Sequence, residues 1–172
     1  MDHLYTPWRM AYIRGDKADA TDCVFCAAQT HSDDDALIVA RGQYHFAILN
    51  RYPYNNGHLM IVPYAHIGSQ EALDSGALLE LMQMTNQALA ALRAVYRPAA
   101  FNLGANIGQA AGAGIAEHFH YHIVPRWPGD ANFMTVTGDT RVIPDTLEHI
   151  YQEVKSAWAH PNAPAAENEA KR

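Results

Sequence analysis

The most informative run of this chain reads Glu117-His118-Phe119-His120-Tyr121-His122-Ile123-Val124-Pro125. Its three histidines alternate with apolar residues, and a period of two is typical of a β-strand. At a rise of roughly 3.3 Å per residue the imidazoles would share one face, each about 6.6 Å from the next. The apolar residues between them would take the other face, which is the core side. A merely solvated face would favour charged residues, so the run predicts a reaction site.

Three interpretations of the histidine run are open on the residues alone. The imidazoles can be structural side chains that are simply hydrogen-bonded, although evenly spaced trios are uncommon in protein cores. Histidines at positions i and i+2 of a strand can also ligate zinc. In the third interpretation one neutral imidazole is a nucleophile, because its ordinary pKa of about 6.5 leaves it uncharged near pH 7. The other two would then orient it and hydrogen-bond a phosphate.

Size and composition limit the classes of function. A chain of 172 residues that is 49% hydrophobic fits one well-cored domain. The net charge of -6 argues against a nucleic acid or an anionic membrane as partner, so a phosphate-bearing ligand must be held by local dipoles and a few side chains. No apolar run is long enough to span a membrane. Two cysteines and an opening without a signal-peptide pattern predict a cytoplasmic protein.

The hydrophobic pattern predicts an α+β fold with an antiparallel sheet. The histidine run is expected to be its fifth strand. The other expected strands are 36–40, 44–49, 58–62 and 100–107, and the expected helices are a long one over 69–96 and a C-terminal one over 144–159. Residues 1–160 form the expected single domain, which includes an aromatic arm at 5–13 that docks on the body or on a second subunit. Residues 161–172 are expected to be a disordered tail.

A glycine-rich loop lies between the fourth expected strand and the histidines. Gly108, Gly112 and Gly114 let the backbone approach a ligand closely and direct N–H groups at an anion. No Walker-type lysine follows, so the loop is not a P-loop. Its place directly before three histidines predicts a phosphate cradle. The chain has no G-x-S-x-G elbow, which argues against a serine hydrolase.

Cys23 and Cys26 have the spacing of half a zinc site. They can also be two buried thiols, whereas a redox pair would need a thioredoxin-like βαβ context that is absent. A tetrahedral site needs two more ligands. His66 and His118 are the candidates, because thiolate and imidazole together suit structural zinc.

The run from His118 to Val124 matches His-φ-His-φ-His-φ-φ, where φ is apolar, which is the signature of the histidine triad (HIT) superfamily. Residues 46–51 and 57–63 resemble the nucleotide-binding half of that family, as in the dinucleoside polyphosphate hydrolases of the fragile-histidine-triad branch. Similarity to bacterial diadenosine tetraphosphate phosphorylases of the superfamily extends to 4–13, 52–63 and 125–133. The resemblance covers roughly residues 4–155 and implies the HIT fold.

The resemblance implies roles for individual residues. His120 would be the nucleophile that becomes a nucleotidyl-imidazole. His122 would bond the phosphate or orient His120, and His58 would orient the triad from the neighbouring strand. His118, the first histidine of the triad, would complete the catalytic group. Asn50 would contact the ribose region.

The α-phosphate would be held by Asn106 and by the loop around Gly112, Gly114 and Ile115, whose amides would serve as an oxyanion cradle. Many family members carry Gln or Ser where this chain has Gly114 and Ile115, so in this chain the backbone amides must provide more of the contacts to the phosphate. The zinc-containing branches, which include the galactose-1-phosphate uridylyltransferases, pair a CxxC with a later histidine and the first triad histidine. That pattern implies structural zinc on Cys23, Cys26, His66 and His118, although similar phosphorylases do not all carry the cysteine pair.

The function implied by the resemblance is cleavage of an adenine dinucleoside polyphosphate at the α-phosphate through a covalent nucleotidyl-histidine, by water or by inorganic phosphate. Residues 127–133 favour the phosphorylase-like group. A phosphoramidase acting on adenosine phosphoramidates is an alternative, as are a nucleotide-binding module without turnover and a metal hydrolase that uses all three histidines as ligands. The resemblance also implies a homodimer.

Overall fold

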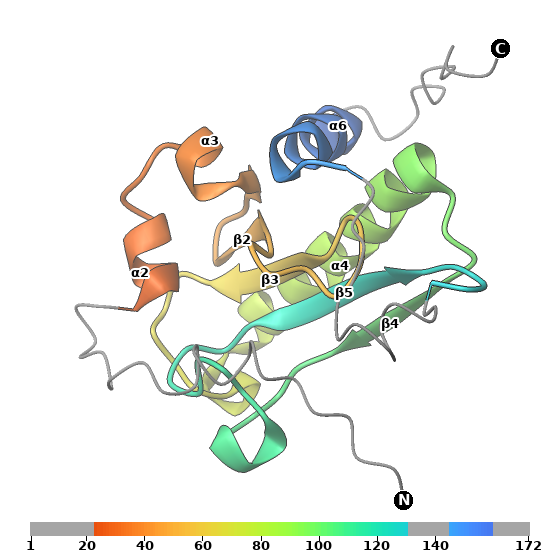
Figure 1. Ribbon diagram of the computed structural model, residues 1–172. Coiled ribbons are helices and arrows are strands. Elements are labelled where there is room, and N and C mark those ends of the chain that lie inside the picture. The colour runs from red at the N-terminus through yellow and green to blue at the C-terminus, as the bar shows by residue number, and fades with distance from the viewer. Residues whose placement is uncertain (1–22, 131–144, 160–172) are drawn as a thin grey trace, which may run out of the picture.

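A five-stranded antiparallel sheet forms the centre of the computed structural model, which describes residues 23–130 and 145–159. The strands follow one another in the order β1-β2-β3-β5-β4. Their bounds are β1 (Ile38–Arg41), β2 (His45–Leu49), β3 (Leu59–Pro63), β4 (Ala100–Gly104) and β5 (Tyr121–Arg126). The predicted α+β fold is confirmed, and β5 lies inside the sheet between β3 and β4 (Figure 1).

The histidine run is not one continuous strand, contrary to the prediction. β5 begins only at Tyr121, so His118 and His120 lie in irregular chain before it. The physical reason is that the neighbouring strands extend no farther: β3 and β4 pair only with residues from Tyr121 onward. The alternation of faces still continues, since Phe119 packs in the same core cluster as Ile123.

Helices cover both faces of the sheet. On one face, α4 (Ser75–Tyr96) and α6 (Leu147–Ala159) build the larger core with the strands (Figure 1). The short helix α2 (Val24–Ala28) covers the other face, where Phe25 and Ala28 pack against apolar residues of β1, β2 and β3. The expected long and C-terminal helices are thus both present.

The expected helix over 69–96 is divided near its start. A separate 3-10 turn, η2 (Gln70–Ala72), comes first, and α4 begins after Asp74. The Asp74 carboxylate accepts a hydrogen bond from the Ala77 amide at 2.8 Å, and an N-cap of this kind has extended backbone that a helix cannot continue through. At the other end Arg97 takes left-handed backbone with φ +46° before Pro98, which confirms the predicted helix end.

Other boundaries differ from the pattern in smaller ways. The fourth strand ends at Gly104 and the last helix begins at Leu147. The acidic segment after α2 contains the short helix α3 (Asp33–Ala36), and a second 3-10 turn, η3 (Gln109–Ala111), lies in the glycine-rich loop. Asp34 accepts hydrogen bonds from the Tyr151 hydroxyl and the Lys155 ammonium group, both at 2.8 Å, which ties α3 to α6.

Glu80 of α4 fastens the β1–β2 hairpin to the helix. Its carboxylate accepts hydrogen bonds from the amides of Gln43 (2.6 Å), Tyr44 (2.7 Å) and His45 (2.9 Å), and lies 3.0 Å from Nδ1 of His45. Burial opposes ionisation of Glu80, yet the hydrogen bonds from His45 and the amides hold its pKa below the ordinary 4.5. The carboxylate therefore stabilises the fold in its charged form.

We expect Glu80→Ala to lower the free energy of unfolding by about 2–4 kcal/mol, because it leaves the part-buried donors of Tyr44 and His45 without their acceptor. Urea unfolding at pH 7 measures the loss, and Glu71→Ala at an exposed position is the matched control. Because the folded pKa of Glu80 is depressed, its contribution is present above the unfolded pKa near 4.5 and is lost as the pH falls through the folded pKa. Equal unfolding midpoints for the two variants would contradict this account.

No helix in the two described ranges is long and apolar enough to cross a bilayer. The expected aromatic arm at 5–13 and the expected tail at 161–172 lie outside the described residues.

Candidate active site

Three of the predicted catalytic histidines form one cluster beside β3 and β5. His58 stands directly before β3, His122 is the second residue of β5, and His120 precedes that strand. The ring centroids of His58 and His122 lie 5.1 Å apart, and those of His120 and His122 lie 4.8 Å apart. His58 and His120 are buried, whereas His122 is half-buried. The cluster therefore reaches solvent through His122.

Backbone geometry fixes the tautomers of His58 and His122. The amide of Tyr54 donates to Nδ1 of His58 at 3.0 Å, so in the neutral ring the proton is on Nε2. That Nε2 lies 2.9 Å from Nδ1 of His122 and donates to it. His122 in turn carries its own proton on Nε2, which makes that atom a hydrogen-bond donor.

His120 has the opposite tautomer. Its Nδ1 lies 2.8 Å from the backbone carbonyl of His118, which can only accept, so Nδ1 carries the proton and Nε2 has the lone pair. Burial lowers the pKa of His120, and the neutral ring is therefore favoured. Its ring packs on Phe25 of α2 with centroids 5.1 Å apart. Two neighbouring imidazoles thus present a lone pair and an N–H, which is the pair of groups needed to attack phosphorus and to hold a phosphate oxygen.

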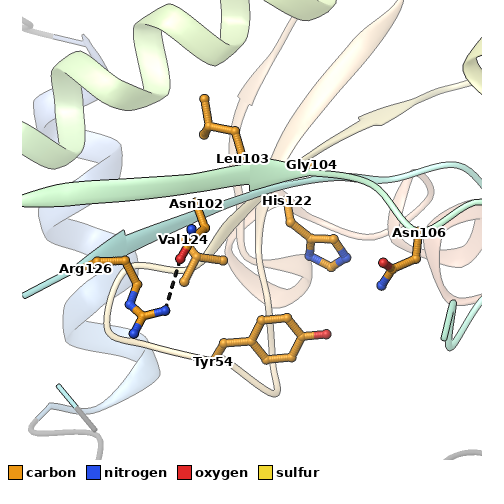
Figure 2. A pocket seen from close by; sticks show the side chains of 8 residues that line it. All are labelled: Tyr54, Asn102, Leu103, Gly104, Asn106, His122, Val124 and Arg126. Carbon is orange, nitrogen blue, oxygen red and sulfur yellow. Dashed lines mark hydrogen bonds between the residues drawn. The ribbon is translucent and has the colours of Figure 1, made fainter. Parts of the chain in front are cut away.

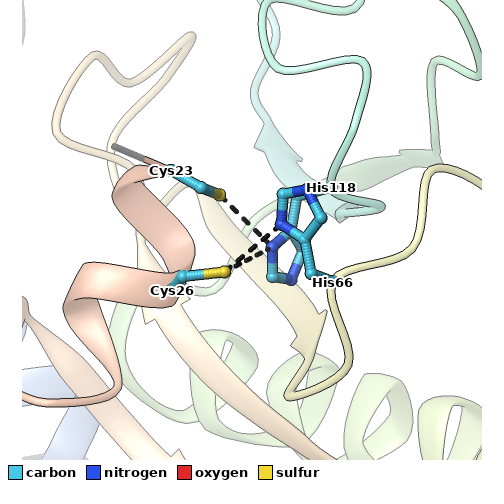
Figure 3. A group of neighbouring side chains, drawn as sticks. All are labelled: Cys23, Cys26, His66 and His118. Atoms are coloured by element: carbon cyan, nitrogen blue, oxygen red, sulfur yellow. Dashed lines mark hydrogen bonds between the residues drawn. The ribbon is translucent and has the colours of Figure 1, made fainter. Parts of the chain in front are cut away.

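His118 belongs to a second cluster with the cysteine pair, shown in Figure 3. Its Nδ1 lies 3.3 Å from Sγ of Cys23 and 3.6 Å from Sγ of Cys26, whose sulfur is also 3.3 Å from Nδ1 of His66. Nε2 of His118 donates to the carbonyl of Pro63 at 2.9 Å, so Nδ1 directs a lone pair at the thiols. Both ring nitrogens of His118 are thus committed to these contacts, and its carbonyl is the group that contacts His120.

The cluster fits a tetrahedral zinc ion. Zn–S bonds of about 2.3 Å and Zn–N bonds of about 2.1 Å would separate sulfur and nitrogen ligands by about 3.6 Å. The four ligand atoms all lie within 4.8 Å of one another. Burial and the adjacent Cys23 thiol raise the pKa of Cys26, so the thiolates that a metal needs are unfavourable without a cation. The structure brings together all four residues that the sequence predicted as ligands.

An open pocket of about 360 Å³ begins at His122 and continues along β4 and β5. Eight residues line it, namely Tyr54, Asn102, Leu103, Gly104, Asn106, His122, Val124 and Arg126 (Figure 2). The ring of Tyr54 stacks near that of His122, with centroids 5.7 Å apart and planes inclined by 26°. The predicted residue Asn106 is therefore at the pocket with His122.

The other predicted nucleotide-binding residues do not line this pocket. Asn50 lies beside His58. Its Oδ1 accepts a hydrogen bond from the Tyr52 amide at 2.9 Å, and its Nδ2 is 3.4 Å from Nδ1 of His58. Gly112 directly follows η3 and has left-handed backbone with φ +84°. Ile115 packs against the core on the α2 side of the sheet, and Gly114 directly precedes it.

Sequence reasoning missed most of the residues that line the pocket and one that packs on the predicted nucleophile. Tyr54, Asn102 and Arg126 line the pocket, and Phe25 packs against His120. Arg126 could have been predicted from the strand pattern, because residues two and four positions after His122 lie on the same face of a strand. The others come from segments far away in the sequence.

Comparison with known proteins agrees with this architecture. The model of the HIT domain family matches residues 31–129. The AP-4-A phosphorylase of Mycobacterium tuberculosis is 42% identical over 166 residues, which cover 92% of this chain and 85% of that protein.

Two solved structures share the fold. A zinc-bound histidine triad family protein from Mycobacterium smegmatis superposes with a TM-score of 0.65 at 24% identity, over 82% of this chain and 96% of its own. A hypothetical histidine triad nucleotide-binding protein from Sulfolobus tokodaii superposes with a TM-score of 0.64 at 23% identity, over 80% of this chain and 92% of its own. The family model, the relative and the shared fold all agree with the histidine run: the chain belongs to the HIT domain family.

Proposed function

We propose that this chain cleaves adenine dinucleoside polyphosphates at the α-phosphate, with His120 as the nucleophile. The observation that carries the proposal is the pair of opposite tautomers in adjacent rings, because His120 has its lone pair on Nε2 whereas the neighbouring His122 has its proton on Nε2. Nucleophile and oxygen-binding donor are both set before substrate arrives, and such preorganisation is a major source of catalytic power. The 42% identity to an AP-4-A phosphorylase supports this substrate class.

The reaction proceeds in two displacements. Nε2 of His120 forms a bond to the α-phosphorus, and the bond from that phosphorus to the bridging oxygen breaks, so that the second nucleotide leaves. The N–H of His122 holds a non-bridging phosphate oxygen. Water or inorganic phosphate then forms a new P–O bond, the P–N bond breaks, and His120 is released as a neutral imidazole. Phosphate as acceptor gives a phosphorylase, which the relative favours.

Product analysis tests the proposal. From diadenosine tetraphosphate the first step releases ATP, and the adenylyl group leaves as ADP with phosphate or as AMP with water. We expect ADP and ATP in the presence of phosphate. An acid-labile adenylyl-protein should be trappable, which would exclude a binding module without turnover. Faster cleavage of adenosine phosphoramidate than of the tetraphosphate would favour the phosphoramidase alternative.

Zinc is proposed as a structural ion held by Cys23, Cys26, His66 and His118. The supporting observations are the four ligand atoms that lie within 4.8 Å of one another and the lone pair that His118 directs at the thiols. When bound, the ion would cross-link α2 to the segment that follows β3, through His66, and to the segment that precedes β5, through His118. Reduced cysteines at this site are also the reason for proposing a cytoplasmic location.

A homodimer is proposed through α4 and the outer edge of β4. Leu79 (60% exposed), Met82 and Leu78 form an apolar face on α4, and Leu103 of β4 is 45% exposed. β4 pairs on one side with β5 and is the last strand of the sheet formed by the described residues, so a second copy can pair with it across a two-fold axis. We expect Leu79→Glu to convert a dimer into monomers in light scattering, whereas Gln87→Glu at another exposed α4 position should not. A monomeric wild-type protein would contradict this proposal.

A further inference from the structure

The pocket beside His122 is an elongated groove. Its floor is built from cross-strand neighbours, with His122 opposite Gly104 and Val124 opposite Asn102. His122, Val124 and Arg126 share one face of β5, so the groove runs for about 13 Å at 3.3 Å per residue. Figure 2 shows Leu103 directed to the opposite side of the strands, toward α4. At about 360 Å³ the space falls in the range of small-molecule sites, far above the roughly 30 Å³ of one water.

The groove leads away from the nucleophile. His120 lies before β5 against Phe25, and Val124 and Arg126 lie progressively farther along the extended strand. In an in-line displacement at phosphorus the attacking and departing atoms lie on opposite sides of the phosphorus atom. A phosphate attacked by Nε2 of His120 would therefore release its leaving group in the direction of the groove.

The lining of the groove suits a nucleotide with its phosphates. None of its eight lining residues is acidic, although the whole chain has a net charge of -6. Arg126 has five N–H donors, of which three are given to Asp130 and to Oδ1 of Asn102, so among the described residues two remain for an anion. The pair of bonds to Asp130, at 2.6 and 2.8 Å, holds the guanidinium in place. The ring of Tyr54, which packs against His58 and His122, adds an aromatic side chain to the lining, and nucleotide bases stack on such rings.

We infer that this groove is the subsite for the departing nucleotide, with Asn102, Arg126 and Tyr54 as its specificity-determining residues. The inference rests on the proposed function, since it assigns a place to the second half of a dinucleoside polyphosphate. It predicts that the groove favours substrates whose leaving group is itself a nucleotide over substrates with a small leaving group.

Two substrates with the same attacked half test the inference. Diadenosine tetraphosphate releases ATP, whereas adenosine 5′-phosphoramidate releases only ammonia. Asn102→Asp keeps the size of the side chain and its acceptor toward Arg126 but places a negative charge in the groove. We expect the ratio of kcat/KM for the tetraphosphate to that for the phosphoramidate to fall at least roughly tenfold, because like charges repel across a binding site. Gln87→Glu makes the same amide-to-carboxylate change on exposed α4 and should leave the ratio at the wild-type value.

The outcomes separate this inference from the proposed function. An equal loss on both substrates, or an unchanged ratio in Asn102→Asp, would overturn the subsite while leaving the proposed function in place. A wild-type protein that does not cleave the tetraphosphate would overturn both. If Asn102→Asp unfolds, Asn102→Ala serves instead, with a smaller fall of the ratio in the same direction.

Discussion

His120→Ala is expected to reduce cleavage of diadenosine tetraphosphate by at least roughly a thousand-fold, because loss of a covalent nucleophile removes the whole two-step route. Nucleotide binding should remain measurable, since the groove along β4 and β5 is built from other residues. Steady-state turnover and isothermal titration with a non-hydrolysable dinucleotide measure the two effects separately. No adenylyl-protein should be trapped in the variant.

The control for this experiment is His149→Ala, which removes a histidine from the exposed surface of α6. It should retain wild-type turnover. The decisive contrary result is a His120→Ala protein that turns over at the wild-type rate, because the reaction would then use another group. Comparison with His122→Ala adds a second test, since the loss of an oxygen-binding donor typically lowers kcat by about a hundred- to a thousand-fold.

The second large effect is expected at the cysteine–histidine cluster. His66→Ala removes one of four predicted ligands and should release the bound zinc, which elemental analysis of the purified protein measures. We expect the melting temperature to fall by roughly 10 °C, because losing a structural metal site costs several kcal/mol and each kcal/mol is worth about 2–4 °C in a chain of this size. A chelator should lower the melting temperature of the wild type by a similar amount and that of His66→Ala very little.

His31→Ala is the matched control, because His31 is an exposed histidine outside the cluster. Activity should also fall in His66→Ala, by about 10- to 100-fold, since His118 both faces the thiols and presents the carbonyl that orients His120. A wild-type protein that contains no zinc, and whose melting temperature responds neither to added zinc nor to a chelator, would refute the metal assignment.

Much of the fold follows from sequence periodicity. The alternation around His120 correctly separated a core face, with Phe119 and Ile123, from a polar face. The pairing of Cys23 and Cys26 with two distant histidines was also anticipated, because ligand chemistry restricts the choice of partners. These features depend on side-chain type and spacing, which a sequence displays directly.

The features that sequence could not supply depend on neighbours in space. β5 begins at Tyr121 because its partner strands reach no farther, and no local pattern contains that information. The tautomers of His58 and His120 depend on an amide of Tyr54 and a carbonyl of His118, and every residue of a chain offers such backbone groups. Asn50 was assigned to a ribose contact by resemblance, and its contacts with Tyr52 and His58 appear only in three dimensions.

The interior position of β5 has a consequence for how this chain can tolerate insertions and deletions. Removal of Tyr121 at the start of β5 would shift the register and exchange the two faces, so that His122 would turn toward α4 and α6 and its apolar neighbours toward the groove. The paired strands on both sides make a local bulge costly, so such a deletion would abolish the site even though every histidine was still encoded. Length changes in the segment that contains η3, which belongs to no strand, leave that register intact.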